Sequence, residues 1–200
     1  MDYFETRYIQ EGYDRIAGVD EAGRGPLAGP VVAAAIILPS EGVGEPLFDS
    51  KKLSPKKRER LYEVLCSKAI AIGIGIVSSE EIDSLNILQA TLKAMTQAVE
   101  HLSIPPDLLL IDGPHGLPLS IPQKAIPKGD QLSNSIAAAS IVAKVTRDRL
   151  MLQFHQKYPQ YNFARHKGYG TLEHRRAIER FGICDIHRKT FRGVKEFFDR

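Results

Sequence analysis

The chain has 200 residues, of which 43% are apolar and 26% are charged, the balance of a soluble globular protein with a sizeable core. No apolar stretch is long enough to cross a membrane, and the N-terminus lacks the basic start and apolar centre of a signal peptide. The two cysteines lack metal-binding spacing, so we expect a reduced compartment, the cytoplasm, and no structural zinc.

The net charge of +3 hides an uneven distribution. Residues 51–60 and residues 160–200 each carry a local charge of +5, whereas residues 78–113 carry −5. Basic segments that flank carboxylates would suit a polyanion brought to a metal centre. The alternative is that these are solvated surface charges, and charge by itself leaves both interpretations open.

Four apolar segments predict the strands of an α/β domain with a mixed sheet. These segments are residues 16–20, 31–38, 69–77 and 107–112. Helices are predicted to begin after the cap Ser54 and to carry the apolar stripes that start at Leu88 and Ala138. A further helix is predicted over residues 171–181, before Gly182. Because strands and helices alternate only in part, we expect a helical C-terminal portion.

An acidic pair ends the first predicted strand, where Asp20 and Glu21 are followed at once by Gly23-Arg24-Gly25. Carboxylates can hold a hard divalent cation, and the backbone N–H groups of a glycine turn can hold a phosphate or a sugar. Metal and phosphate binders this close together suggest phosphodiester chemistry.

Two more carboxylates follow other predicted elements. Asp112 closes an apolar strand, so it would meet Asp20 at one edge of the sheet if the two strands are neighbours. A turn-forming aspartate is the alternative for Asp112. Asp130 precedes the alanine-rich helix and is either an N-terminal cap or first-turn acid favoured by the helix dipole, or a further metal ligand. Asp148, inside that helix, is interpreted as an ion-pair residue.

Two basic segments could contact a nucleic acid. Lys56, Lys57 and Arg58 occupy the first turn of a predicted helix, where positive charge opposes the helix dipole, so phosphate contact is favoured over screened surface charge. The second segment, residues 165–171, surrounds Tyr169, which could stack on a sugar or base or could lie as a lid over the core. His187-Arg188 is expected to be structural.

Two nucleotide-binding motifs are excluded. Gly18 and Gly23 have phosphate-loop spacing, but Arg24-Gly25 stands where Lys-Ser or Lys-Thr is required. The glycines from Gly23 onward imitate a dinucleotide-binding fingerprint, yet a strand-like run follows where that motif needs a helix.

Together these motifs closely resemble the ribonuclease HII family, the bacterial type 2 ribonucleases H. The matching stretches are Gly18–Ala35, Asp49–Ser54, Ile111–Gly113, Lys128–Asp130, Ala137–Asp148 and His166–Thr171. The resemblance implies a ribonuclease H-like fold, a mixed five-stranded sheet flanked by helices, in one catalytic domain over residues 1–200 with a helical part from roughly 155. It also implies hydrolysis of RNA in RNA–DNA hybrids and cutting 5′ to a single ribonucleotide in duplex DNA.

The resemblance also implies roles for individual residues. The catalytic, metal-binding carboxylates would be Asp20, Glu21, Asp112 and Asp130. Gly23-Arg24-Gly25 would contact the ribose 2′-OH largely through backbone groups, and Tyr169 would stack near the RNA–DNA junction. We expect further substrate contacts from Lys51, Lys52, Lys128, His166 and Lys167.

Four carboxylates without histidine or cysteine suit two Mg²⁺ or Mn²⁺ ions, which would lie roughly 3.5–4 Å apart during hydrolysis. The expected partners are RNA–DNA hybrids and ribonucleotide-containing duplex DNA, with no membrane, and the expected state is a monomer. Two other classes stay open. A nucleic-acid-binding module without activity is disfavoured by the four carboxylates, and a phosphatase of small substrates by the basic segments.

Overall fold

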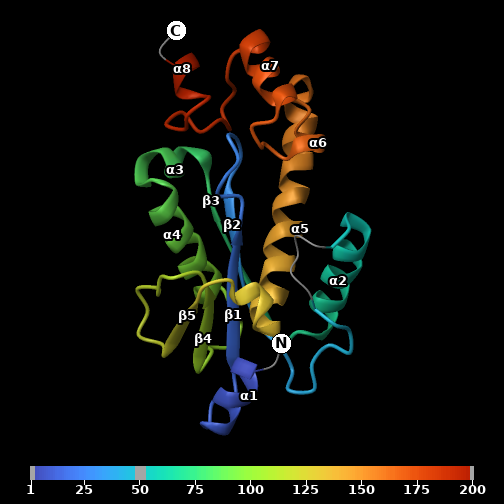
Figure 1. Ribbon diagram of the computed structural model, residues 1–200, viewed down its shortest axis with the longest axis vertical. Helices are drawn as coiled ribbons and strands as arrows, with labels where there is room; N and C mark the ends of the chain where they lie inside the picture. Colours follow the sequence, from blue (N-terminus) through green and yellow to red (C-terminus); the bar gives the residue numbers. More distant parts are fainter. Residues whose placement is uncertain (1–2, 48–52, 199–200) are drawn as a thin grey trace.

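The computed structural model describes residues 3–47 and 53–198 and contains a mixed five-stranded sheet of order β3-β2-β1-β4-β5 (Figure 1). The strands are β1 (Ile16–Ala22), β2 (Val31–Ile37), β3 (Ala71–Val77), β4 (Leu108–Asp112) and β5 (Gln123–Ile126). β1 pairs antiparallel with β2 and parallel with β4. β2–β3 is antiparallel and β4–β5 is parallel. The implied five-stranded mixed sheet is therefore confirmed, although β5, short and only partly buried, has no apolar pattern that predicts it.

Helices cover both faces of this sheet. The α-helices are α1 (Tyr3–Gln10), α2 (Pro55–Lys68), α3 (Ser79–Leu85), α4 (Ile87–Glu100), α5 (Asn134–Lys157), α6 (Phe163–His166), α7 (Leu172–Phe181) and α8 (Lys195–Phe198). Two 3-10 turns, η2 (Gly129–Gln131) and η3 (Pro159–Tyr161), flank α5. No helix in the described part of the chain is long and apolar enough to span a membrane.

The central strands pack closely against α4 on one face and α5 on the other (Figure 1). β2 is buried along its whole length, as its continuous apolar run predicts. Glycines set the spacing, because a Cβ on Gly18 would lie 2.0 Å from the carbonyl carbon of Ser135 in α5. On the other face a Cβ on Gly75 would lie 1.9 Å from the carbonyl oxygen of Ala94 in α4.

The predicted helix starts are confirmed. The Ser54 hydroxyl accepts from the Lys57 amide at the start of α2, and the Thr171 hydroxyl caps α7, which ends before Gly182. Of the predicted stripe that begins at Leu88, Met95 and Val99 are buried in α4, whereas Leu88 and Leu92 are only partly buried. The other buried positions of this helix are taken by small residues, Ala90, Thr91, Ala94 and Ala98. The alanine-rich stripe is fully buried in α5.

One predicted phosphate contact at the start of α2 is wrong. Arg58 is buried, and its guanidinium donates to the Leu53 carbonyl and pairs with Asp148 at 3.6 Å. Asp148 also accepts from Lys144 Nζ at 2.7 Å, so its predicted ion-pair role is confirmed. Lys51 and Lys52, two predicted substrate contacts, lie outside the described residues.

The C-terminal helices form a second, smaller core beyond the end of the sheet, beside the far end of α5 (Figure 1). Its buried members include Leu27 from the turn between β1 and β2, Met151 from α5, and Phe163 and Ile178 from the C-terminal part. This core holds the loop around Tyr169 against the turn that follows the acidic pair.

Candidate active site

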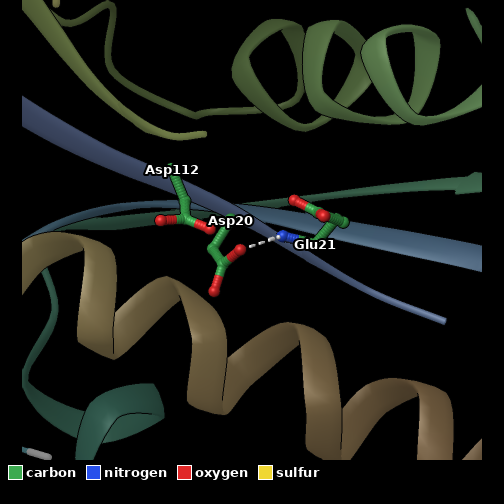
Figure 2. A group of neighbouring side chains, drawn as sticks. All are labelled: Asp20, Glu21 and Asp112. Carbon is green, nitrogen blue, oxygen red and sulfur yellow. Dashed lines mark hydrogen bonds between the residues drawn. The ribbon is translucent and has the colours of Figure 1, made fainter. Parts of the chain in front are cut away.

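Three carboxylates meet at the carboxyl ends of two neighbouring parallel strands. β1 pairs with β4 so that Val19 lies opposite Ile111, which places Asp20 beside Asp112. One carboxylate oxygen each from Asp20, Glu21 and Asp112 lies within 4.8 Å of the others. Figure 2 shows the Asp20 side chain pointing towards α5, with Glu21 on the other side of the strand. The predicted meeting of Asp20 and Asp112 is therefore confirmed.

Hydrogen bonds fix two of these side chains. The Glu21 amide donates to Asp20 Oδ1 at 2.7 Å (Figure 2), and the Ser140 side chain of α5 also bonds to Asp20. Asp112 Oδ1 accepts from the Gly129 amide at 2.7 Å. The sequence assigned Ser140 no role, although a buried serine in an otherwise apolar helix face was a usable indication.

The cluster concentrates negative charge where little water reaches. Burial raises the pKa of Asp20 well above its usual range, and the charges of Glu21 and Asp112 raise it further. Burial also raises the pKa of Glu21, although the Arg24 guanidinium, 3.3 Å from its carboxylate, acts in the opposite direction. A divalent cation would relieve this repulsion, and an all-oxygen donor set suits Mg²⁺ or Mn²⁺ rather than zinc.

The fourth predicted carboxylate, Asp130, is not one of the three carboxylates that meet at the strand ends. Asp130 is buried in η2, next to the Gly129 whose amide holds Asp112. Its alternative role as the cap of α5 is wrong, because the Ser133 hydroxyl accepts from the Ile136 amide at that helix start.

The Gly23-Arg24-Gly25 turn and the Tyr169 loop lie side by side. Gly25 is exposed, and, its chain neighbours aside, the one atom of the described residues within 4 Å of a Cβ built there is a ring carbon of the half-exposed Tyr169, at 3.7 Å, so the backbone of Gly25 is open to a ligand. Gly23 has a different reason for lacking a side chain. Its φ is +100°, and a Cβ would lie 2.1 Å from Nε of the buried Arg147.

The predicted substrate contact of His166 needs correction. His166 is 7% exposed, its Nδ1 accepts from the Gly168 amide, and its Nε2 lies 2.7 Å from the Tyr161 carbonyl. Both ring nitrogens of His166 thus contact backbone groups of this chain, and the contact with the Gly168 amide stabilises the loop that carries Tyr169. Lys167 is half buried and its amine donates to the Ala164 carbonyl. Lys128 is exposed immediately before η2.

Solved structures define the class to which this fold and site belong. The chain is similar to the ribonuclease H2 from Pyrococcus horikoshii OT3, with a TM-score of 0.80 and 27% identity over 94% of this chain and 98% of that one. It is also similar to the ribonuclease HII of the PCNA:RNase HII complex from Archaeoglobus fulgidus, with a TM-score of 0.74 and 25% identity over 90% and 96% of the two chains. The fold is that of a ribonuclease H.

The sequence narrows this class to one family. The family Ribonuclease HII matches residues 17–194. A ribonuclease HII from Syntrophus aciditrophicus is 62% identical over 193 residues, which are 96% of this chain and 91% of that relative. The chain belongs to the ribonuclease HII family, and it is a ribonuclease H, a nuclease that acts on RNA paired with DNA.

Proposed function

We propose that this ribonuclease HII hydrolyses the RNA strand of RNA–DNA hybrids and also nicks duplex DNA 5′ to a single embedded ribonucleotide. The observation that carries this proposal is the cluster of Asp20, Glu21 and Asp112, because Glu21 stands only two residues before the Gly23–Gly25 turn. A hydrolytic centre next to a turn with exposed backbone can cleave the phosphodiester bond at a nucleotide and contact the ribose of that same nucleotide. Residues 1–200 would act as one catalytic domain.

The carboxylates would hold two Mg²⁺ or Mn²⁺ ions, with Asp130 as the fourth ligand. Bound ions of this kind activate a water and stabilise the charge that develops on the leaving oxygen. The protein's own contribution is to fix the ligands. The Ser140 side chain and the Glu21 amide hold Asp20, while the Gly129 amide holds Asp112.

Recognition of the ribose would fall to the turn and the loop beside it. The 2′-OH is the group that distinguishes RNA from DNA, and Gly25 presents open backbone at this point. The half-exposed Tyr169 ring lies next to Gly25, where it can stack on the sugar or base at the junction. An open depression beside α7 is lined by Arg176 and by Arg165, which pairs with Glu173 at 3.3 Å, and the excess of positive charge there could contact flanking phosphates.

Cleavage of two duplexes tests the proposal. We expect the wild type to cut a fully hybrid duplex, and to nick a DNA duplex with one ribonucleotide on the 5′ side of that ribonucleotide. Asp112→Asn should cut neither while melting cooperatively. Asp107→Asn is the matched control. Asp107 lies just before β4, at the opposite end of that strand from Asp112, and pairs there with Arg15.

Near-normal turnover by folded Asp112→Asn would overturn the assignment of the carboxylates. Cleavage of the full hybrid without any nick at the single ribonucleotide would limit the function to hybrids.

A further inference from the structure

Two buried arginines bind backbone carbonyls of the segment that begins with the Gly23-Arg24-Gly25 turn, for which we propose ribose recognition. Arg188 and Arg147 are both fully buried. Arg188 donates through Nε to the Gly29 carbonyl at 3.0 Å, through NH1 to the Arg24 carbonyl at 2.9 Å, and through NH2 to the Gly23 carbonyl. Arg188 thus holds two successive peptide groups of the turn.

Arg147 ties the same turn to the Tyr169 loop. Its guanidinium donates to the carbonyls of Ala28 at 3.1 Å and Pro30 at 3.0 Å, and also to that of Lys167 at 3.0 Å. The two arginines therefore bind six backbone carbonyls, five of them in the segment that connects β1 and β2.

A buried guanidinium normally pairs with a carboxylate. Among the residues that the structure describes, no carboxylate forms an ion pair with Arg147 or Arg188. Burial lowers the pKa of Arg188 to about 9 and that of Arg147 to about 10, so both stay charged at neutral pH. Desolvating two cations for backbone carbonyls is costly, which indicates that the position of that backbone matters.

The held carbonyls determine where the amides of the turn point. All peptide bonds in the described residues are trans, so each N–H points opposite to the carbonyl of its own peptide group. With the carbonyls of Gly23 and Arg24 turned inward to Arg188, the amides of Arg24 and Gly25 point away from the buried guanidinium. Neither amide has a hydrogen-bond partner among residues 3–47 and 53–198.

We infer that Arg188 is a positioning residue for ribose recognition, which fixes the Arg24 and Gly25 amides as outward-facing donors to the nucleotide that carries the 2′-OH. Arg147 supports the same arrangement by fixing the turn to the loop that carries Tyr169. This inference rests on the proposed recognition of the ribose. Arginine is required because its planar fork spreads N–H donors over three nitrogens that reach three carbonyls at once, whereas the three donors of a lysine ammonium share one nitrogen.

The test measures ribose selectivity rather than stability. Binding of a DNA duplex with one ribonucleotide and of the same all-DNA duplex is measured in Ca²⁺, and the ratio of the two affinities is compared between variants. We expect Arg188→Lys to lower this ratio about fivefold if one amide contact is lost and about thirtyfold if both are lost. Affinity for the all-DNA duplex should stay nearly unchanged.

Arg58→Lys is the matched control, since Arg58 is also buried but contacts the Leu53 carbonyl and Asp148. It should keep the wild-type ratio. An unchanged ratio in folded Arg188→Lys, or an equal loss in Arg58→Lys, would overturn the inference and leave the proposed function intact. A wild-type ratio near one would overturn the proposed ribose recognition itself.

A second measurement needs no substitution and decides the matter if Arg188→Lys does not fold. In ¹⁵N-labelled wild type, the Arg24 and Gly25 amides should exchange rapidly with solvent when free. They should become protected with the one-ribonucleotide duplex and less so with the all-DNA duplex. Protection in the free protein, or equal protection by both duplexes, would overturn the inference.

Discussion

Replacing Asp20 by asparagine should make the metal-free protein more stable. Asp20 is buried beside two other carboxylates, each with an oxygen within 4.8 Å of one of its own. Two full charges at that distance repel by about 3.5 kcal/mol at an effective dielectric constant near 20. Proton uptake and side-chain movement reduce this cost, so we expect a gain of about 1–3 kcal/mol in the free energy of unfolding.

For a chain of this size such a gain corresponds to a rise in the melting temperature of roughly 3–10 °C. The assay is thermal unfolding in EDTA at pH 7.5. Because the pKa of Asp20 is raised, the folded state of the wild type takes up a proton as the pH falls, and the repulsion disappears. The advantage of Asp20→Asn should therefore shrink towards pH 4.

Divalent ions should reverse the order of stability. Mg²⁺ or Mn²⁺ that binds only the folded wild type raises its melting temperature with concentration, and Asp20→Asn should respond much less. Asp107→Asn is the control, and its effect on stability should be opposite. The Arg15 guanidinium lowers the pKa of Asp107, so removing the Asp107 charge should destabilise the folded protein. An Asp20→Asn protein that is less stable than wild type in EDTA, with an unchanged response to metal, would refute this reasoning.

Three further predictions concern the loop, the packing and the pH dependence. Tyr169→Ala should lower single-turnover cleavage at one embedded ribonucleotide about a hundredfold through misalignment, with a much smaller loss of affinity in Ca²⁺; equal losses would make the ring a binding contact only. Gly18→Ala should cost about 3 kcal/mol or more in urea unfolding, because its Cβ would lie 2.0 Å from backbone of Ser135; normal stability would contradict that contact. Burial lowers the pKa of His174 and His187 to about 4. Between about pH 6.5 and 4 the unfolded state therefore binds more protons than the folded state, and the free energy of unfolding falls as the pH is lowered through that range. Urea unfolding of wild type against His174→Asn checks this, and identical pH profiles would contradict it.

Local patterns in the sequence were sufficient where a single element decides the outcome. The run of residues 31–38 predicted a strand buried on both faces, and Ser54 and Thr171 predicted helix starts, because capping and burial depend on nearby residues. The acidic pair Asp20-Glu21 predicts a metal site for the same reason, since that prediction depends only on two adjacent residues. Asp112 could be attached to it only under the condition that the two strands are neighbours.

The tertiary structure decided what depends on residues far apart in the chain. It placed β4 beside β1, which completed the carboxylate cluster, and it added Ser140 from α5 as a partner of Asp20. It also reassigned Arg58 and His166 from substrate to internal contacts, because no local pattern shows whether a basic side chain is buried.

The clearest case is Arg188, which in the sequence follows a histidine in a segment without a motif. Its three carbonyl partners lie about 160 residues earlier in the chain, so only the folded chain brings them within hydrogen-bonding distance. The sequence by itself predicted the carboxylates for which we propose the chemistry, since that prediction depends on residue type and short spacing. The direction in which the amides of Arg24 and Gly25 point is decided by the long-range contacts of Arg188 with the Gly23 and Arg24 carbonyls.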